Sequence, residues 1–194
     1  FYYSLPPSKN HKLVANVLDL ILEKFPENYD SSGEHALRVR KNQIVQRASS
    51  LICISQKTKE DLLEFMQVPQ NVKVEVVYPG INHEYYRQRP ASLEEELRAM
   101  GITFPYLLQV GGRLKHKNFL RLAEAFAHSL IPKDIFLVCA GEFWSPEEKA
   151  TLIRLGIEDR VRLFHYPDED QLRLLYQGAT LFIYPSLYEG FGFP

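Results

Sequence analysis

Short apolar runs alternate along the chain with longer stretches in which apolar residues recur every three or four positions. The short runs are typical of buried strands, and the longer stretches are typical of helices with one apolar face. Strands are predicted within residues 13–18, 50–55, 72–80, 106–112, 134–141, 160–166 and 180–186. Helices are predicted within residues 33–49, 55–66, 92–101, 117–130, 145–156 and 168–179.

Several helix boundaries carry recognisable start and stop residues. Ser55, Ser92 and Ser145 each precede a helical pattern, where a serine side chain accepts a hydrogen bond from the first free backbone amides. Pro146 occupies the first helical position after Ser145, where proline is favoured. Gly101 is a stop signal for the helix that follows Ser92.

The alternation of strands and helices predicts an α/β protein whose parallel sheets are covered by helices on both faces. The second half reads as a Rossmann-like open sheet, in which ligands bind beyond the carboxyl ends of the strands. A polar, proline-marked stretch at residues 80–90 has the character of a linker. The predicted division therefore separates residues 1–82 from residues 83–194.

Composition narrows the class of protein. Hydrophobic residues make up 45% of the chain and charged residues 24%, which is typical of a globular domain and argues against disorder. With a net charge of −1, no nucleic-acid partner is expected. No apolar run reaches the roughly 20 residues of a membrane span. Cys53 and Cys139 lie in apolar runs and are interpreted as packed thiols, which fits a reducing cytoplasm.

Three predicted strand ends carry unusual side chains. In the first, Gly111 and Gly112 allow a sharp turn, and Arg113 and Lys117 follow just before a helix. An anion there would meet two cations and the free amides of the helix start. A solvated basic loop beside a glycine turn explains the same residues equally well, so both interpretations stay open.

The second strand end carries Glu142 and Trp144, and the tryptophan is interpreted as a cover for a helix start in preference to a ligand contact. At the third, Glu189 precedes Gly190 and Gly192, whose bare amides suit an anion-binding nest. Glu189 would repel a phosphate but would accept hydrogen bonds from sugar hydroxyls. A ligand with both groups accounts for the combination, and a glycine-rich turn with a solvated glutamate is the alternative.

Together and in this order, these segments resemble the retaining glycosyltransferases of the GT-B fold. The resemblance is to the large family that includes bacterial mannosyl- and rhamnosyltransferases of polysaccharide assembly. The matching segments are YLLQVGGRLKHKNFLRLAEAF, LRLLYQGATLFIYPSLYEGFGFP and, more weakly, RASSLICISQKTKEDLL with VEVVYPGI. They cover nearly the whole chain, and the combination is specific although no single loop is.

The resemblance implies a GT-B protein of which only part is present. Residues 1–82 would be the last part of an N-terminal, acceptor-side domain, and residues 83–194 a nucleotide-sugar donor domain that stops inside its own signature. The family's second glutamate, eight positions after Glu189, would lie beyond Pro194. The chain is therefore expected to be a fragment that is inactive by itself.

The resemblance also implies roles for individual residues. Arg113 and Lys117 would contact the donor diphosphate and Glu189 the donor sugar, which makes these three the catalytic candidates. Further donor-binding candidates are Gly111, Gly112, Glu142, Tyr166, Gly190, Phe191 and Gly192. No cofactor or metal is implied, since the chain has no Asp-x-Asp sequence and no cluster of ligands with metal-binding spacing.

The implied reaction moves a sugar from a nucleotide diphosphate to a glycan or lipid-linked acceptor with retention at the anomeric carbon. GDP-mannose is the first candidate donor, and UDP- and dTDP-sugars stay open. Fixed cations and amides would stabilise the charge on the departing nucleotide. The full-length protein is expected in the cytoplasm, with peripheral association with a membrane as a further expectation.

One position departs from the family pattern. The family often has His-Asp where this chain has Leu18-Asp19, and a leucine can neither donate nor accept a hydrogen bond. A GT-B-like protein that binds nucleotide sugar without turnover is therefore the alternative function. Other GT-B chemistries, such as a sugar-nucleotide epimerase or a phosphorylase, are weaker alternatives.

Overall fold

The computed structural model describes residues 11–29, 31–86, 89–102 and 105–193, except for the side chains at positions 84 and 86. The chain forms two compact units. The first consists of Phe1–Ile81 together with Tyr188–Phe193, and the second is formed by Asn82–Leu187. Residues 1–10 of the predicted first domain lie outside the described residues.

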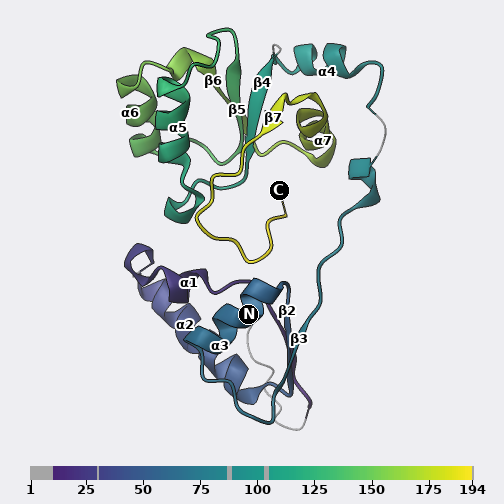
Figure 1. Cartoon of the computed structure of the whole chain (residues 1–194), viewed down its shortest axis with the longest axis vertical. Coiled ribbons are helices and arrows are strands. Elements are labelled where there is room, and N and C mark those ends of the chain that lie inside the picture. Colours follow the sequence, from purple (N-terminus) through teal and green to yellow (C-terminus); the bar gives the residue numbers. More distant parts are fainter. Residues whose placement is uncertain (1–10, 30, 87–88, 103–104, 194) are drawn as a thin grey trace. The chain divides into compact units, whose positions relative to one another are not determined.

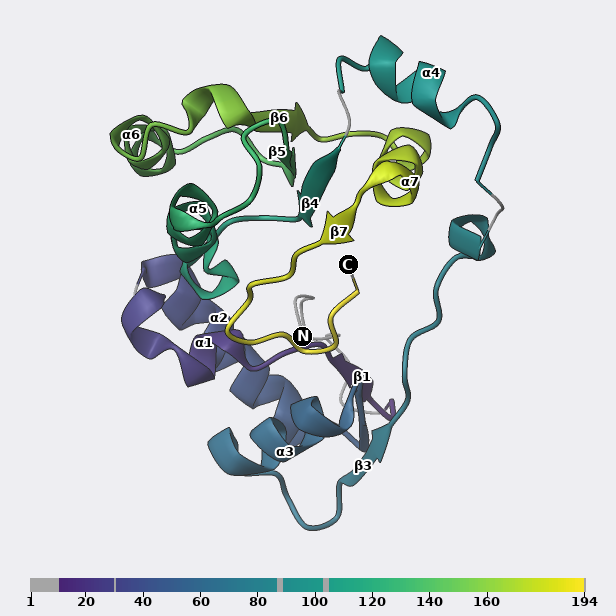
Figure 2. The same ribbon diagram turned by 45° about the horizontal axis from the view of Figure 1, so that its top comes forward.

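The first unit is a parallel sheet with helices packed against it (Figures 1 and 2). The strand order is β1-β2-β3, and both strand pairs run parallel. The strands are β1 Val14–Val17, β2 Ser50–Cys53 and β3 Lys73–Val76. The helices are α1 Ile21–Lys24, α2 Ser32–Arg47 and α3 Gln56–Phe65, with a short 3-10 turn at Pro26–Asn28.

Alternation along the strands decides which face of the first sheet is buried. Val17, Leu51 and Cys53 form the core together with Ile44 of α2 and Leu62 of α3. The alternate strand positions face away, and four of them are exposed: Val14, Asn16, Lys73 and Glu75. Within the described residues, helices therefore cover only one face of this sheet, and the expectation of two covered faces is not met there.

The second unit is a four-stranded parallel sheet with the order β6-β5-β4-β7. Its strands are β4 Tyr106–Val110, β5 Phe136–Gly141, β6 Val161–His165 and β7 Leu181–Phe182. Its helices are α4 Leu93–Ala99, α5 Phe119–His128, α6 Pro146–Arg154 and α7 Glu169–Gly178. Short 3-10 turns lie at His83–Tyr86, Lys115–Lys117 and Glu158–Arg160.

Helices cover both faces of the second sheet, which confirms the prediction for this part of the chain (Figure 1). On one face, Leu107, Leu137 and Cys139 pack with residues of α5 and α6. On the other, Leu108 and Val138 pack with residues of α4 and α7. Neighbouring positions of β4 and β5 thus supply opposite cores, which is why these strands are apolar throughout.

The predicted helix caps are mostly confirmed. The Ser55 hydroxyl accepts a hydrogen bond from the Thr58 amide at 3.0 Å. Ser145 and Glu148 form a reciprocal capping box, with bonds of 3.2 and 2.7 Å. The prediction is wrong for Ser92, because its side chain makes no cap bond and its hydroxyl donates to the Glu96 carboxylate.

The carboxyl-terminal residues group differently from the predicted domains. The passage between units at Ile81 and Asn82 lies close to the predicted division, and the functional roles of the two domains stay predictions. Tyr188–Phe193, which the prediction assigns to the donor domain, pack with the first unit. The chain therefore passes between the units twice, the second time after Leu187.

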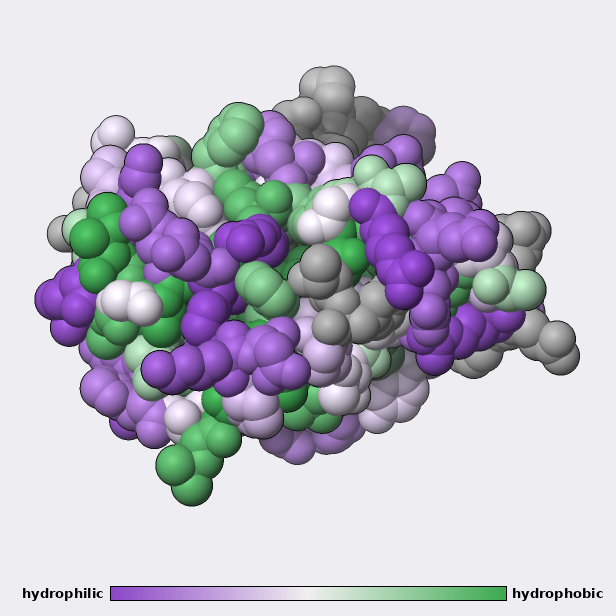
Figure 3. Space-filling model, turned by 90° about the horizontal axis from the view of Figure 1, so that it is seen from above, coloured by the Kyte–Doolittle hydropathy of each residue, from purple (hydrophilic) through white to green (hydrophobic). Residues whose placement is uncertain are grey.

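Within the described residues, no helix combines the length and apolar character needed to cross a lipid bilayer. On the face shown in Figure 3, hydrophilic residues are interspersed with small groups of apolar ones. Both cysteines are buried and free, as predicted. Burial raises the pKa of Cys53 to about 11 and that of Cys139 to about 12.

Because each unit contains one fully buried cysteine, thiol labelling reports on each core separately. Neither Cys53 nor Cys139 is expected to react with iodoacetamide at pH 8 in the folded protein, since the thiolate is the nucleophile and both thiols are inaccessible. Leu62→Ala, in the first core, should cost about 2–5 kcal/mol and accelerate labelling of Cys53. Leu152→Ala should act in the same way on Cys139. Peptide mass spectrometry measures both rates, and fast labelling of the folded wild type would contradict the burial.

Candidate functional site

A pocket lies at the carboxyl-terminal edge of the second sheet, where β4, β5 and β6 end. Its volume is about 200 Å³. It is lined by Val110, Gly111, Gly112, Ala140, Gly141, Glu142, Tyr166, Pro167 and Leu172. Four of the predicted donor-binding residues, Gly111, Gly112, Glu142 and Tyr166, therefore come together in one hollow.

The absence of a side chain at Gly141 lets the ends of β4 and β5 approach one another at this pocket. Gly111 and Gly141 both have positive φ, of 105° and 157°. A Cβ on Gly141 would lie only 2.6 Å from the carbonyl oxygen of Gly111. A side chain at position 141 would therefore push the two strand ends apart and reshape the pocket.

Aromatic rings form one side of this region. Phe143 and His165 stack with ring centroids 3.4 Å apart, and Tyr166 meets His165 edge-on at 4.7 Å. Tyr166 has a φ of 44°, a conformation that bulky residues rarely adopt. The residue is 65% exposed, so the strained backbone presents an aromatic side chain beside the pocket.

Arg113 is a buried structural cation. Its Nε donates to the Glu148 carboxylate at 3.0 Å, and its Nη2 donates to the backbone carbonyls of Glu142 and Phe143 at 2.6 and 2.8 Å. The guanidinium also lies over the Trp144 ring, 4.4 Å from its centroid. Arg113 therefore holds the loop between β5 and α6 in place through hydrogen bonds to its carbonyls and to Glu148.

The burial of Arg113 contradicts one of the two interpretations left open by the sequence, that of a solvated basic loop. Only 8% of the residue is exposed, and it does not line the pocket. Its Nη1 is buried without a hydrogen-bond partner among the described residues and lies 3.6 Å from where a Cβ would stand on Gly141. Nη1 thus lies near the glycine turn, while Nε and Nη2 bind Glu148 and the loop carbonyls.

Trp144 packs as predicted and lies away from the pocket lining. Its ring stacks on Phe119, the first residue of α5, at 5.3 Å, and it belongs to the rim of the core beneath α5 and α6. The interpretation of Trp144 as a cover for a helix start agrees with this position.

Lys117 lies beside the amino end of α5, in the 3-10 turn Lys115–Lys117. Its ammonium is 5.9 Å from the centroid of the Tyr184 ring, and it does not line the pocket. Asn118 follows with a φ of 60° and uses its side chain to donate to the Pro185 carbonyl, so it provides no cap bond to α5. The first amides of α5 are therefore not covered by a capping side chain.

Glu189, Gly190, Phe191 and Gly192 belong to the first unit. Gly190 is buried, and a Cβ there would overlap the carbonyl oxygen of Leu18. Glycine is thus required at position 190 by a close backbone approach, a reason different from the bare amide that the sequence suggested. Gly192 has a φ of 92°, and Phe191 is 40% exposed.

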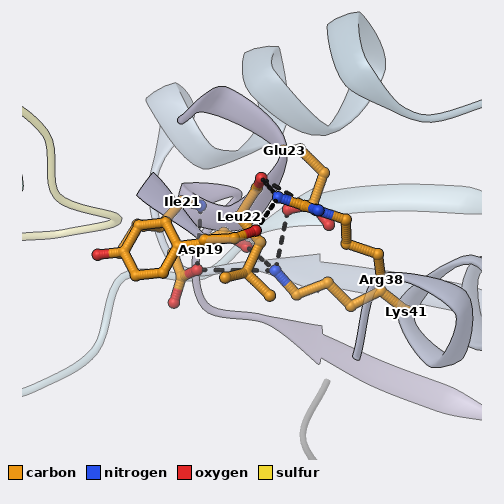
Figure 4. Close-up of polar contacts among 7 residues, drawn as sticks. Asp19, Ile21, Leu22, Glu23, Arg38 and Lys41 are labelled. Carbon is orange, nitrogen blue, oxygen red and sulfur yellow. Dashed lines mark hydrogen bonds and ion pairs between the residues drawn. The ribbon is translucent and has the colours of Figure 1, made fainter. Parts of the chain in front are cut away.

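The neighbouring Asp19 is held in a buried polar cluster (Figure 4). Its carboxylate accepts a hydrogen bond from the Ile21 amide at 3.2 Å and lies 3.8 Å from the Lys41 ammonium. Lys41 is almost fully buried and also pairs with Glu23 at 3.0 Å. Asp19 therefore has a structural role, as Leu18-Asp19 joins β1 to α1.

Sequence reasoning missed part of the site. Phe143 was not singled out, although it follows Glu142 directly at the end of a strand. Leu172 lies in α7 and reaches the pocket only through the fold, and Glu148 carried no signal beyond helix capping. Among the described residues, no group of three or more His, Cys, Asp or Glu side chains could hold a metal ion.

Comparison with known proteins gives consistent matches. The family model described as glycosyl transferases group 1 matches residues 94–194. O-antigen chain mannosyltransferase RfbU of Salmonella typhimurium is 26% identical over 153 residues, which are 77% of this chain and 39% of that relative. O-antigen chain mannosyltransferase B of Escherichia coli is 22% identical over 195 residues, 97% of this chain and 50% of that relative.

Among solved structures, Anabaena Alr3699/HepE in complex with UDP-glucose matches with a TM-score of 0.73 at 23% identity. The match covers 94% of this chain and 49% of that chain. The chain thus spans about half the length of the proteins it resembles, or less.

Because the Arg113–Glu148 pair is buried, a substitution of Arg113 tests whether this residue stabilises the second unit. Arg113→Ala leaves Glu148 charged and buried, so it should destabilise the second unit by about 3–5 kcal/mol. Arg154→Ala, which breaks the exposed pair with Glu124, is the matched control and should cost less than about 1 kcal/mol. Urea unfolding followed by Trp144 fluorescence measures both, and equal effects would contradict the structural role of Arg113.

Proposed function

The chain belongs to the glycosyl transferases group 1 family and has the GT-B fold, and on that premise we propose that its second unit binds the nucleotide diphosphate of an activated sugar. The complete protein would transfer that sugar to a glycan or lipid-linked acceptor with retention at the anomeric carbon. The observation that carries the proposal is the pocket, to which three successive strand ends contribute Gly111, Glu142 and Tyr166.

The position and size of the pocket support this assignment. Ligands of open parallel sheets bind beyond the carboxyl ends of the strands, where this pocket lies. A volume of about 200 Å³ is below the 300–1,000 Å³ of a typical small-molecule site, so it suits one part of the donor. We assign it to the nucleoside: Tyr166 offers a ring face for the base, and the Glu142 carboxylate accepts hydrogen bonds from hydroxyls.

The diphosphate would lie at the amino end of α5. This ten-residue helix has no capping side chain, and Lys117 lies in the turn before it. Helix amino ends favour anions through their free amides and dipole. Arg113 would contribute fixed positive charge near the glycine turn, and its Nη1 makes no hydrogen bond to any residue that the structure describes. These groups would stabilise the charge that develops on the leaving nucleotide.

The donor sugar would contact Glu189, through hydrogen bonds from its hydroxyls to the carboxylate. Mannose is the proposed sugar, as GDP-mannose, because the curated relatives RfbU and mannosyltransferase B are named as mannosyltransferases. A UDP-hexose is the second donor to test, since HepE was solved with UDP-glucose. The proposed place of action is the cytoplasm, with the glycan acceptor presented at a membrane.

A second candidate function is nucleotide-sugar binding without turnover. Leu18 favours it, because its side chain has no polar group and is 38% exposed where the family often has a histidine. Donor hydrolysis or transfer by a protein that includes the residues beyond Pro194 separates the two functions. Binding with turnover supports the transferase, and binding without turnover in the presence of acceptor extracts supports the alternative.

The donor site is testable on the chain itself. GDP-mannose and UDP-glucose should each be titrated calorimetrically at low salt, and one of them should bind saturably. Lys117→Ala should weaken that binding about ten- to hundredfold, because a charge-assisted hydrogen bond to phosphate is lost. Lys133→Ala, an exposed lysine of the same unit, is the matched control and should leave the affinity unchanged.

Two results would contradict the proposed donor site. The first is the absence of saturable binding of any nucleotide diphosphate or nucleotide sugar to the folded wild type. The second is an equal affinity of the Lys117 and Lys133 variants, which would remove the phosphate contact from α5.

A further inference from the structure

Helix α3 carries a row of buried polar residues on one face. Ser55, Thr58 and Asp61 are three positions apart, so they lie along the same side of the helix. Ser55 is 9% exposed, and Thr58 and Asp61 are 0% exposed. Burying polar groups is costly unless they are paired, so a row of this kind requires a partner.

The partner of the two hydroxyls is the backbone of Gly190, more than 130 positions away in the sequence. Ser55 Oγ and Thr58 Oγ1 both donate to the Gly190 carbonyl oxygen, at 2.5 and 2.9 Å. A carbonyl oxygen has two lone pairs, so the two hydroxyl protons saturate it. The Thr58 amide donates in turn to Ser55 Oγ, which ties the arrangement to the first turn of α3.

The third residue of the row, Asp61, forms an ion pair with Lys57 of the same helix at 2.8 Å. Burial tends to raise the pKa of Asp61, but the interactions with Lys57 and with the Tyr188 hydroxyl outweigh it, and the pKa is lowered. The Tyr188 ring is buried, meets Phe25 edge-on at 6.1 Å and lies 5.2 Å from the Lys24 ammonium.

Glu189 thus lies between two anchored residues. Tyr188 is fixed through its ring, and Gly190 through its carbonyl and through the close approach to Leu18 that excludes any side chain. Glu189 itself is partly exposed. It lies near Tyr29, whose pKa is raised by burial and further by the charges of Glu34, Asp19 and Glu189.

We propose that Ser55 and Thr58 form a dock on α3 that holds the Gly190 backbone and, together with the buried Tyr188 ring, fixes the orientation in which the Glu189 carboxylate can accept hydrogen bonds from sugar hydroxyls. Ser55 and Thr58 are then positioning residues that act through Glu189. The orientation of Glu189 toward a sugar depends on the proposed function, whereas the dock itself depends only on the contacts described above.

Hydrogen exchange tests the dock without any ligand. Thr58→Val removes one donor to Gly190 and keeps the side-chain shape, so the amides of residues 188–193 should exchange about tenfold faster. Thr58→Ser restores the hydroxyl and should restore the wild-type rate. Thr151→Val, at a buried threonine of α6, is the matched control and should leave these amides unchanged.

Gly190→Ala tests the same dock from the other side without altering α3. Its Cβ would displace the segment from Leu18, so exchange at residues 188–193 should accelerate while α3 stays protected. If both Thr58→Val and Gly190→Ala fold and leave this exchange at the wild-type rate, the dock is refuted.

Binding measurements test the positioning of Glu189. Thr58→Val should weaken binding of the nucleotide sugar about tenfold and leave binding of the matching nucleotide diphosphate unchanged. Glu189→Gln should produce the same selective loss, and the double variant should lose no more than either single one. Equal weakening of both ligands, or additive losses, would show that Thr58 does not act through Glu189.

The two proposals fail in distinguishable ways. If the wild type binds neither ligand, the proposed donor site is wrong, and hydrogen exchange still decides whether the dock exists. If the wild type binds both ligands equally well, the donor site stands and the role of the dock in orienting Glu189 is refuted.

Discussion

Parallel strand pairing is the constraint on which the arrangement of both units depends. Every strand pair in the two sheets is parallel, so the carboxyl ends of neighbouring strands meet at one edge. In the second unit this brings together loops that are far apart along the chain, and Gly111, Glu142 and Tyr166 come to line one pocket. Strand direction therefore decides which loops meet at the pocket, and the side chains on those loops decide its chemistry.

Arg113 illustrates how one buried cation can hold together a loop and a helix. Its bonds to Glu148 and to two backbone carbonyls fix the loop that carries Glu142, and Glu148 is also the capping residue of α6. Because an unpaired buried charge is costly, neither member of the pair can be lost without disturbing the other. The loss of function in an Arg113 variant would consequently combine a missing charge with a disturbed pocket.

In the first unit, backbone contacts hold a segment that comes from the far end of the chain. The segment Tyr188–Phe193 follows β7 of the second unit, yet its Gly190 carbonyl accepts hydrogen bonds from Ser55 and Thr58, and the Gly190 backbone lies close to the Leu18 carbonyl after β1. The residue that the family resemblance assigns to the donor sugar, Glu189, is thus supported by the unit assigned to the acceptor side.

Sequence alone determined the order of the described strands and helices except for the short α1, the Ser55 and Ser145 caps, the buried cysteines and the parallel α/β class, because these depend on local periodicity and on short-range hydrogen bonds. It also singled out Gly111, Gly112, Glu142 and Tyr166, because glycines and polar residues at strand ends stand out against apolar runs. Only tertiary structure decided that Arg113 is buried against Glu148, that Phe143 stacks on His165, and that the hydroxyls of Ser55 and Thr58 both donate to the Gly190 carbonyl. These contacts join residues far apart in the sequence, and no local pattern records which distant carbonyl or carboxylate will satisfy a buried donor.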